Sequence, residues 1–195
     1  MTASSYGVAD LATDLRSAIM TSSTMMQLLH EVERHLKRLL FNPVFLARDY
    51  GLPIPGDYTP RFLYRDPELL FAIHASMMPP GEWTPVHDHG ETWAVSGVYH
   101  NTLRTLLFER VDDGAVPEKG RVRRLAQIDN RQGEVHVLPP WGIHQNANVT
   151  DELTLSIIVH GRDLNQIWRS TYDLENERHK RVKFGPSPLA SVRSA

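Results

Sequence analysis

The sequence predicts a mainly β protein, an antiparallel barrel or sandwich, with α-helices at its N-terminal end. Two observations lead to this class. Apolar residues recur at three- and four-residue spacing between about residues 8 and 42, which is the period of a helix. After Pro53 the chain changes to short runs with β character, separated by turn residues and with no long helical pattern between them. A chain of 195 residues suffices for about one domain.

The helical portion is predicted over residues 1–50. In its clearest stretch, SSTMMQLLHEVERHLKRLL, the stripe consists of Met25, Leu28, Leu29, Val32, Leu36, Leu39 and Leu40. Ser22 or Ser23 suits the N-cap, and NPVF ends or kinks the helix because the residue before a proline avoids helical conformation. We interpret the apolar stripe as the face that packs on the rest of the protein.

Residues 51–195 are predicted to form the barrel and a C-terminal extension, in one compact domain with the helices. The predicted strands are RFLYRD, LLFAIHASMM, TWAVSGVYHNTLRTLLFERVDDG, RVRRLAQI, EVHVLP and LTLSIIVHG. The separators PPGEWTP, DDGAVPEKG, DNRQG and PPWG are rich in turn-forming residues. The segment DLNQIWRSTYDLENERHK fits a helix or a terminal strand, and its periodicity does not decide between them.

The composition limits the classes of function. The formal net charge of −2 gives no electrostatic basis for a nucleic acid or a membrane surface as partner, and the basic tail at 177–195 is expected to be solvated. No membrane span or leader pattern is present, so we expect a cytoplasmic protein acting on a small molecule; homo-oligomerisation is left open. The absence of cysteine excludes disulfides and thiolate ligands, so a metal site must use histidine, carboxylate or carbonyl groups.

His87 and His89 are the strongest candidates for such a site. Pro85 disfavours a helix here, and on a strand the side chains of residues i and i+2 project from the same face. His144 follows a strand and a tight proline-glycine corner, where a barrel can bring in a third ligand. His30, His35 and His179 are expected at the surface, and His74, His100 and His136 are expected to be packed or surface residues.

These stretches resemble the cupin superfamily, whose fold is a double-stranded β-helix (jelly-roll) barrel. The first cupin motif is matched by Gly81, His87, His89 and Gly97, and the second by Gly133, Pro139, Pro140, Gly142, His144 and Asn148. More narrowly, DPELLFAIHASMMPPGEWTPVHDHGETWAVSGVY, GEVHVLPPWGIHQNAN and LSIIVHGRDL resemble the cysteine dioxygenase-like thiol dioxygenases, especially the bacterial branch acting on 3-mercaptopropionate and related thiols. The resemblance covers about residues 60–170.

The resemblance implies an Fe(II) dioxygenase that converts a small thiol, carrying a carboxylate, to its sulfinate with O2. It implies His87, His89 and His144 as the metal ligands, and an arginine for the substrate carboxylate. Arg169 stands at the matching position, with Arg162 as the second choice. The family's Ser-x-His-x-Tyr relay is matched only by Ser156, because Ile158 and His160 replace the other two residues. Ser156 and His160 are thus the candidate catalytic residues, although His160 equally fits a packed barrel histidine.

The position of Glu91 decides whether the site has three histidine ligands or a carboxylate as a fourth ligand. Most cupins add a glutamate ligand four or five residues past the second histidine, where this chain has Trp93 or Ala94. Glu91 instead lies two residues past His89, where an unbroken strand would turn it toward the metal as a fourth ligand. A bulge at Gly90 would turn it outward, to the surface or to the neighbourhood of the ligands. Asp88 is expected to face away from the metal and to orient an imidazole.

Two other functions stay open. The altered relay motivates a cupin enzyme with another divalent metal and a non-thiol substrate, which cleaves a carbon–carbon bond, isomerises or hydrolyses. A non-catalytic cupin that senses a small molecule is the third.

Overall fold

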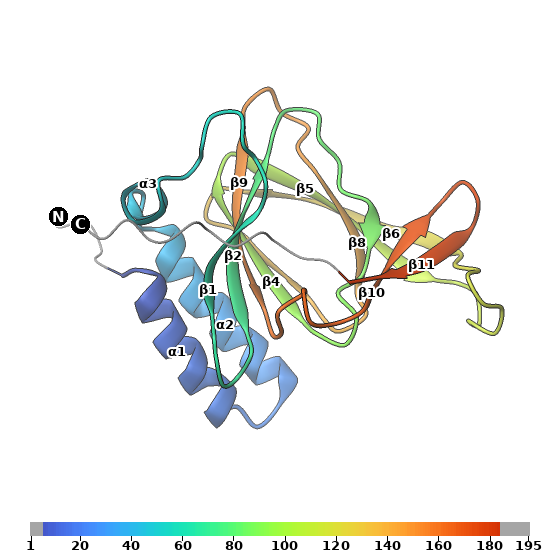
Figure 1. Cartoon of the computed structure of the whole chain (residues 1–195), viewed down its shortest axis with the longest axis horizontal. Helices are drawn as coiled ribbons and strands as arrows, with labels where there is room; N and C mark the ends of the chain where they lie inside the picture. The colour runs from blue at the N-terminus through green and yellow to red at the C-terminus, as the bar shows by residue number, and fades with distance from the viewer. Residues whose placement is uncertain (1–5, 184–195) are drawn as a thin grey trace.

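The computed structural model describes residues 6–183 and shows two antiparallel sheets with helices packed on one side (Figure 1). Residues 184–195 of the basic tail lie outside the described residues. Among the helices of the described range, none is long and apolar enough to span a membrane.

The N-terminal helices are α1 (Val8–Thr21), α2 (Met25–Leu40) and α3 (Phe45–Tyr50). The single pattern predicted over residues 8–42 is therefore two helices. The prediction of Ser22 or Ser23 as N-cap is wrong: Ser22 ends α1, and the Thr24 hydroxyl caps α2 by accepting a hydrogen bond from the Gln27 amide at 3.1 Å. The N-cap is the residue whose side-chain oxygen can accept a hydrogen bond from an unpaired amide of the first turn. The spacing of apolar residues does not show which residue this is.

The first sheet has the order β1-β2-β9-β4-β7. Its strands are β1 (Arg61–Arg65), β2 (Ala72–Met78), β9 (Thr154–His160), β4 (Ala94–His100) and β7 (Val135–Leu138). The second sheet has the order β11-β10-β3-β8-β5-β6. Its strands are β11 (Arg178–Val182), β10 (Arg169–Asp173), β3 (Val86–His87), β8 (Ile143–Ala147), β5 (Thr102–Arg110) and β6 (Val122–Arg131). Distant segments of the chain thus alternate in both sheets, and the predicted mainly β, double-stranded β-helix class is confirmed.

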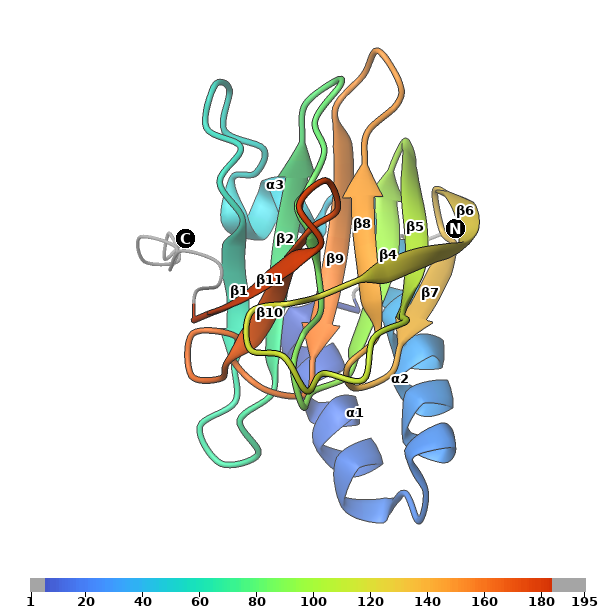
Figure 2. The same ribbon diagram turned by 90° about the vertical axis from the view of Figure 1, so that its right-hand side faces the viewer.

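The segment 163–180, left open between helix and strand, forms the β10–β11 hairpin. β10 pairs with β3, with Thr171 opposite His87 and Tyr172 opposite Val86. Figures 1 and 2 show this hairpin on the side of the barrel away from the α1–α2 pair. The C-terminal strands therefore extend the sheet that carries His87.

The main apolar core lies between the helices and the first sheet. Alternate residues of β9, Leu155, Ile157 and Val159, are buried in this core. A Cβ at Gly97 in β4 would lie 2.7 Å from a Leu40 methyl group, so the glycine allows α2 to pack closely on the sheet. Because successive side chains of a strand point to opposite faces, the other residues of β9 face the interior of the barrel. The site lies there.

Candidate metal centre

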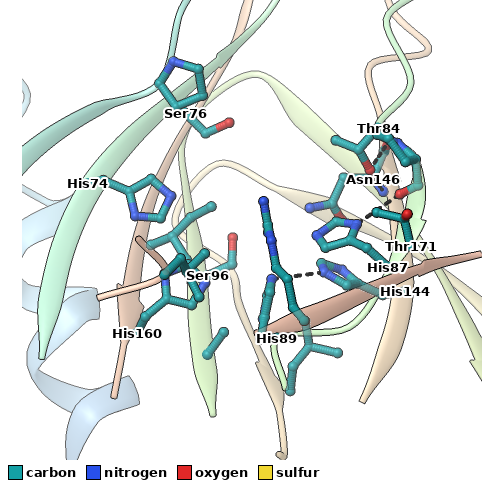
Figure 3. Close-up of a pocket in the computed structure, with 17 residues that line it drawn as sticks. His74, Ser76, Thr84, His87, His89, Ser96, His144, Asn146, His160 and Thr171 are labelled. Carbon is teal, nitrogen blue, oxygen red and sulfur yellow. Dashed lines mark hydrogen bonds between the residues drawn. The ribbon is translucent and has the colours of Figure 1, made fainter. Parts of the chain in front are cut away.

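Two neighbouring strands of the second sheet hold His87 and His144 directly opposite each other. His87 lies in β3 and His144 in β8, and they are partners in the antiparallel ladder. Their ring centroids are 4.4 Å apart, and both rings face the barrel interior in Figure 3. The register between the two strands therefore brings together ligands that are distant in the sequence.

His89 completes the group from the loop after β3. Its ring centroid lies 5.2 Å from that of His87 and 4.9 Å from that of His144. One ligand nitrogen from each of the three histidines lies within 4.8 Å of the other two. The structure thus brings together all three histidines named as ligands, with His87 and His144 on strands and His89 in a loop.

The loop that carries His89 is held by Asp88. This buried carboxylate accepts hydrogen bonds from the amides of Gly90 and Ser170, both at 2.9 Å, and from the Tyr172 hydroxyl at 3.1 Å. Asp88 faces away from the histidines, as expected. The expectation that it orients an imidazole is wrong: it anchors the loop to β10, because β10 supplies the unpaired donors on that side.

Gly90 turns the chain so that Glu91 leaves the site. Gly90 has φ +61°, the left-handed region that favours glycine, and the Trp168 carbonyl group packs against its Cα. The Glu91 side chain is 59% exposed and pairs with Arg162 at 3.2 Å. The structure therefore places Glu91 at the surface, not as a fourth ligand, and places Arg162 there too, outside the cavity.

Burial keeps the histidines neutral. Burial, with the charge of Arg169, lowers the pKa of His87 to about 4. Burial and the neighbouring imidazoles lower the pKa values of His89 and His144 well below the usual value. The His87 Nδ1–H donates to the Pro85 carbonyl at 2.8 Å, which leaves the lone pair on Nε2. Neutral imidazole with one nitrogen so occupied is the form that binds a metal.

The spacing of the nitrogens fits a metal ion. The Nε2 atoms of His89 and His144 are 3.3 Å apart. Two nitrogens each about 2.1 Å from one ion, at angles between octahedral and tetrahedral, lie about 3.0–3.4 Å apart. The Nδ1 atoms of both residues are buried with no hydrogen-bond partner among residues 6–183. The donor set is therefore suited to a divalent ion of the imidazole-binding transition metals.

A cavity of about 300 Å³ adjoins the histidines. Arg169 lines it from β10 and is buried, which lowers the pKa of its guanidinium to about 10, still above neutrality, so the group is cationic. In the β10–β3 ladder Thr171 pairs with His87, so Arg169 stands two residues further along, level with His89. A fixed positive charge thus lines the same cavity as the three candidate ligands.

The β9 residues matched to the family's relay separate in the structure. Ile158 and His160 line the cavity, and the His160 ring stands edge-on to His89 with centroids 4.5 Å apart. The Ser156 hydroxyl is buried, lacks a hydrogen-bond partner within the described chain, and does not line the cavity. The structure therefore brings His160 to the site and leaves Ser156 beyond it.

Sequence reasoning missed His74. This residue of β2 lines the cavity and stacks on His160, with ring centroids 4.9 Å apart and planes at 6°. The alternation of His74 and Ser76 with apolar residues in FAIHASM carried the signal. The expectation that His35 is a surface residue is also wrong, because His35 is buried between α1 and α2 with its Nδ1 2.7 Å from the Asp14 carboxylate.

No family model matches the chain. Among solved structures, cupin-fold proteins are similar at low identity. An oxalate oxidase in complex with the substrate analogue glycolate is 18% identical, with 47% of this chain and 42% of that chain covered and a TM-score of 0.39. A cupin 2 conserved barrel domain protein from Salinispora arenicola is 22% identical over 53% and 74%, with a TM-score of 0.39. Oxalate decarboxylase from Bacillus subtilis is 20% identical over 48% and 22%, with a TM-score of 0.38.

The chain spans less than half the length of the oxalate oxidase and of the decarboxylase that it matches. The chemistry of the site is therefore argued from its own residues.

Proposed function

We propose that the protein is a mononuclear non-haem iron(II) dioxygenase that oxidises a small carboxylate-bearing thiol to its sulfinate. The observation that carries this proposal is a set of three neutral histidines with no carboxylate ligand, next to a buried arginine. The balanced reaction is RS⁻ + O2 → RSO2⁻, in which sulfur is oxidised, dioxygen is reduced and both oxygen atoms form bonds to sulfur.

The donor set favours an anionic sulfur ligand. Iron(II) held by three neutral imidazoles would supply an uncompensated positive charge for a thiolate and the redox capacity for reaction with dioxygen. His87, His89 and His144 would hold the ion at the wall of the cavity that admits the substrate. Glu91 adds no negative charge there, because it pairs with Arg162 at the surface.

Arg169 supplies the site for the substrate carboxylate. The guanidinium is cationic, buried and on the strand next to His87, so it can hold a carboxylate while the thiolate of the same small molecule reaches the metal. Because Arg169 and the three histidines line one cavity of about 300 Å³, we expect a small molecule that carries both groups. The argument from Arg169 applies equally to any short thiol that carries a carboxylate.

Ile158 and His160 define the wall above the reacting groups. Ile158 gives the cavity an apolar lining at this point, and His160 offers a neutral ring nitrogen beside His89. The Nε2 of His160 has no hydrogen-bond partner within the described residues. In the proposed reaction His160 orients the substrate or its oxidised sulfur by a single hydrogen bond, without the relay of the thiol dioxygenases.

A second candidate is a cupin metalloenzyme with a different divalent metal and a non-thiol substrate. The observation that favours it is the altered relay: His160 stands at the position of the family's tyrosine and stacks on His74, and Ile158 replaces the relay histidine. A carboxylate-bearing substrate would still use Arg169, but the reaction would be carbon–carbon cleavage, isomerisation or hydrolysis.

The test is metal analysis coupled to oxygen uptake. Protein from iron-supplied cells is expected to contain about one iron per chain and to consume oxygen with 3-mercaptopropionate or a related thiol, but not with the matching alcohol. His144→Gln is expected to lose the metal and the activity, whereas Glu91→Gln, the matched control two residues past His89, is expected to keep both. Iron-loaded protein that consumes no oxygen with any thiol overturns the proposal. Loss of metal in Glu91→Gln would instead establish a carboxylate ligand and favour the second candidate.

A further inference from the structure

The wall of the cavity opposite the metal ligands carries polar side chains among apolar ones. His87 and His144 lie on the second sheet, whereas His74, Ser96 and His160 project from the first sheet across the cavity (Figure 3). Polar residues on the inward face of a barrel carry a desolvation cost unless a ligand or another group satisfies them.

The pairing of β2 and β4 with β9 brings these three residues together on one face of the first sheet. His74 of β2 and Ser96 of β4 are both opposite Ile158 of the intervening β9, so the three stand in one row. His160 occupies the next row, and its ring stacks on His74. His160 is the diagonal neighbour of both His74 and Ser96. Diagonal neighbours lie about 7–8 Å apart, so one small substituent can contact His160 and one of the other two side chains at once.

Each of these side chains has an unused polar atom. His74, Ser96 and His160 are respectively 5%, 3% and 2% exposed. His74 Nδ1, Ser96 Oγ and His160 Nε2 are buried and have no hydrogen-bond partner in the described part of the chain. All three residues line the cavity, so a molecule bound in it can supply the missing hydrogen-bond partners.

The charge of the cavity restricts what that molecule carries. The Arg169 guanidinium lines the same cavity as the imidazole and hydroxyl groups of these three residues. Imidazole and hydroxyl groups can each donate and accept hydrogen bonds. An ammonium group placed there would lose its hydration beside a cation and meet no carboxylate among the lining residues.

We propose that His74, Ser96 and His160 form a subsite for an uncharged hydrogen-bonding substituent, such as a hydroxyl or amide, on the proposed thiol-carboxylate substrate. The thiolate and the carboxylate would occupy the metal and Arg169, and the third group would face the first sheet. The subsite selects a hydroxy- or amide-substituted thiol acid over both the unsubstituted acid and the amino acid. The identity of the substrate rests on the proposed function, but binding at the subsite can be measured without turnover.

The experiment is calorimetric titration of the iron-loaded protein without oxygen. The three ligands are 3-mercaptopropionate, its 2-hydroxy derivative and cysteine. The hydroxy compound is expected to bind about 3–10-fold more tightly than 3-mercaptopropionate, which is the contribution of one net hydrogen bond, and cysteine is expected to bind most weakly. Equal affinities for the three ligands, or tightest binding by cysteine, overturn the proposal.

Variants locate the preference. Ser96→Ala and His74→Phe, which keeps a ring stacked on His160, are each expected to remove most of the preference for the hydroxyl and to leave the affinity for 3-mercaptopropionate within about twofold. His74→Gln restores a donor and an acceptor and is expected to recover part of the preference. Ser22→Ala is the matched control, because its hydroxyl is also buried without a partner in the described chain but lies at the end of α1. A preference that survives in both Ser96→Ala and His74→Phe overturns the proposal.

Oxygen uptake separates the two proposals. A calorimetric preference that depends on His74 and Ser96, with no thiol oxidised, supports the subsite and refutes the dioxygenase. Oxidation of all three thiols with equal binding refutes the subsite and supports the dioxygenase. Failure of all three ligands to bind overturns both.

Discussion

Replacement of Gly90 by alanine tests whether the backbone after β3 positions His89. Gly90 adopts φ +61°, its amide donates to Asp88 at 2.9 Å, and its carbonyl accepts from the Trp141 amide at 2.8 Å. A Cβ at this position would lie 3.3 Å from the Trp168 carbonyl carbon and closer still to the oxygen, inside the 3.0 Å limit that real Cβ atoms keep. The Trp168 group is backbone, so it cannot rotate away.

The structure gives the size of the effect. The left-handed conformation costs a residue with a Cβ about 1–2 kcal/mol, and the overlap adds about 1–3 kcal/mol of packing strain. Relief of the overlap moves the loop by about 1 Å, and His89 is the adjacent residue, so its nitrogen leaves the position that it shares with His144. Because disturbing the groups that orient a metal-bound histidine costs about 10–100-fold in affinity, Gly90→Ala is expected to weaken metal binding by that factor.

The assay is competition with a chelator for the bound metal, together with urea unfolding of the metal-free protein. Gly133→Ala is the matched control, since Gly133 has φ +83° but nothing lies within 4 Å of a Cβ built there. The control is expected to lose about 1–2 kcal/mol of stability and to keep its metal affinity. If Gly90→Ala binds metal as tightly as the unmodified protein, either His89 is not a ligand or the loop does not position it, and the argument fails.

Three further perturbations act on separate parts of the site. Arg169→Gln is expected to raise KM for a carboxylate-bearing thiol about 10–100-fold, through loss of a charge-assisted pair, while the metal content stays the same; an equal rise for a thiol without a carboxylate would contradict this. Asp88→Asn is expected to cost about 1–3 kcal/mol of stability and to lower the Tyr172 pKa from about 12, which burial and the Asp88 carboxylate raise; an unchanged ultraviolet titration of the phenol would refute it. Burial lowers the pKa of His136 to about 4, below the 6.5 of the unfolded chain, so its contribution to stability is present above pH 6.5 and is lost as the pH falls toward 4. At pH 5 the loss from His136 is about 2 kcal/mol, and urea unfolding should show a shallower acid slope in His136→Asn, whereas an identical slope would exclude this residue.

Hydrophobic periodicity predicted the architecture because the apolar side chains of the helices and of the first sheet are buried in one core between them. The stripe of α2 and the alternation in β9 both mark the core between the helices and the first sheet. Periodicity did not predict the secondary structure of a short segment that buries a polar residue. β10 has five residues, and its buried Arg169 looks like a surface charge in the sequence, so the segment fitted a helix as well as a strand. The cavity that buries this arginine is formed by strands remote in the sequence, which a local pattern does not report.

The candidate site likewise contains residues that the sequence could predict and residues that depend on the pairing of distant strands. His87 and His89 are near in sequence, and His144 stands in a second motif, so their association could be predicted from spacing and resemblance. The roles of His74 and Asp88 depend on strand register instead: His74 meets the site because β2 pairs with β9, and Asp88 finds its donors on β10. For a histidine in a strand with alternating polar and apolar residues, the neighbouring sequence does not show which distant residues will lie on the same face of the sheet.

The donor set is determined by the backbone conformation at one glycine. On a regular strand His87, His89 and Glu91 would all project from one face and give a site with a carboxylate. The left-handed turn at Gly90, held from one side by Asp88 and from the other by the Trp168 carbonyl, sends Glu91 to Arg162 at the surface. The charge balance follows: with no carboxylate ligand, a divalent ion keeps its full charge for anionic ligands from the cavity, and Arg169 adds a second site of the same sign. With a divalent ion bound, the cavity would hold two positive centres, the ion and Arg169, and the proposed substrate would place its thiolate at one and its carboxylate at the other.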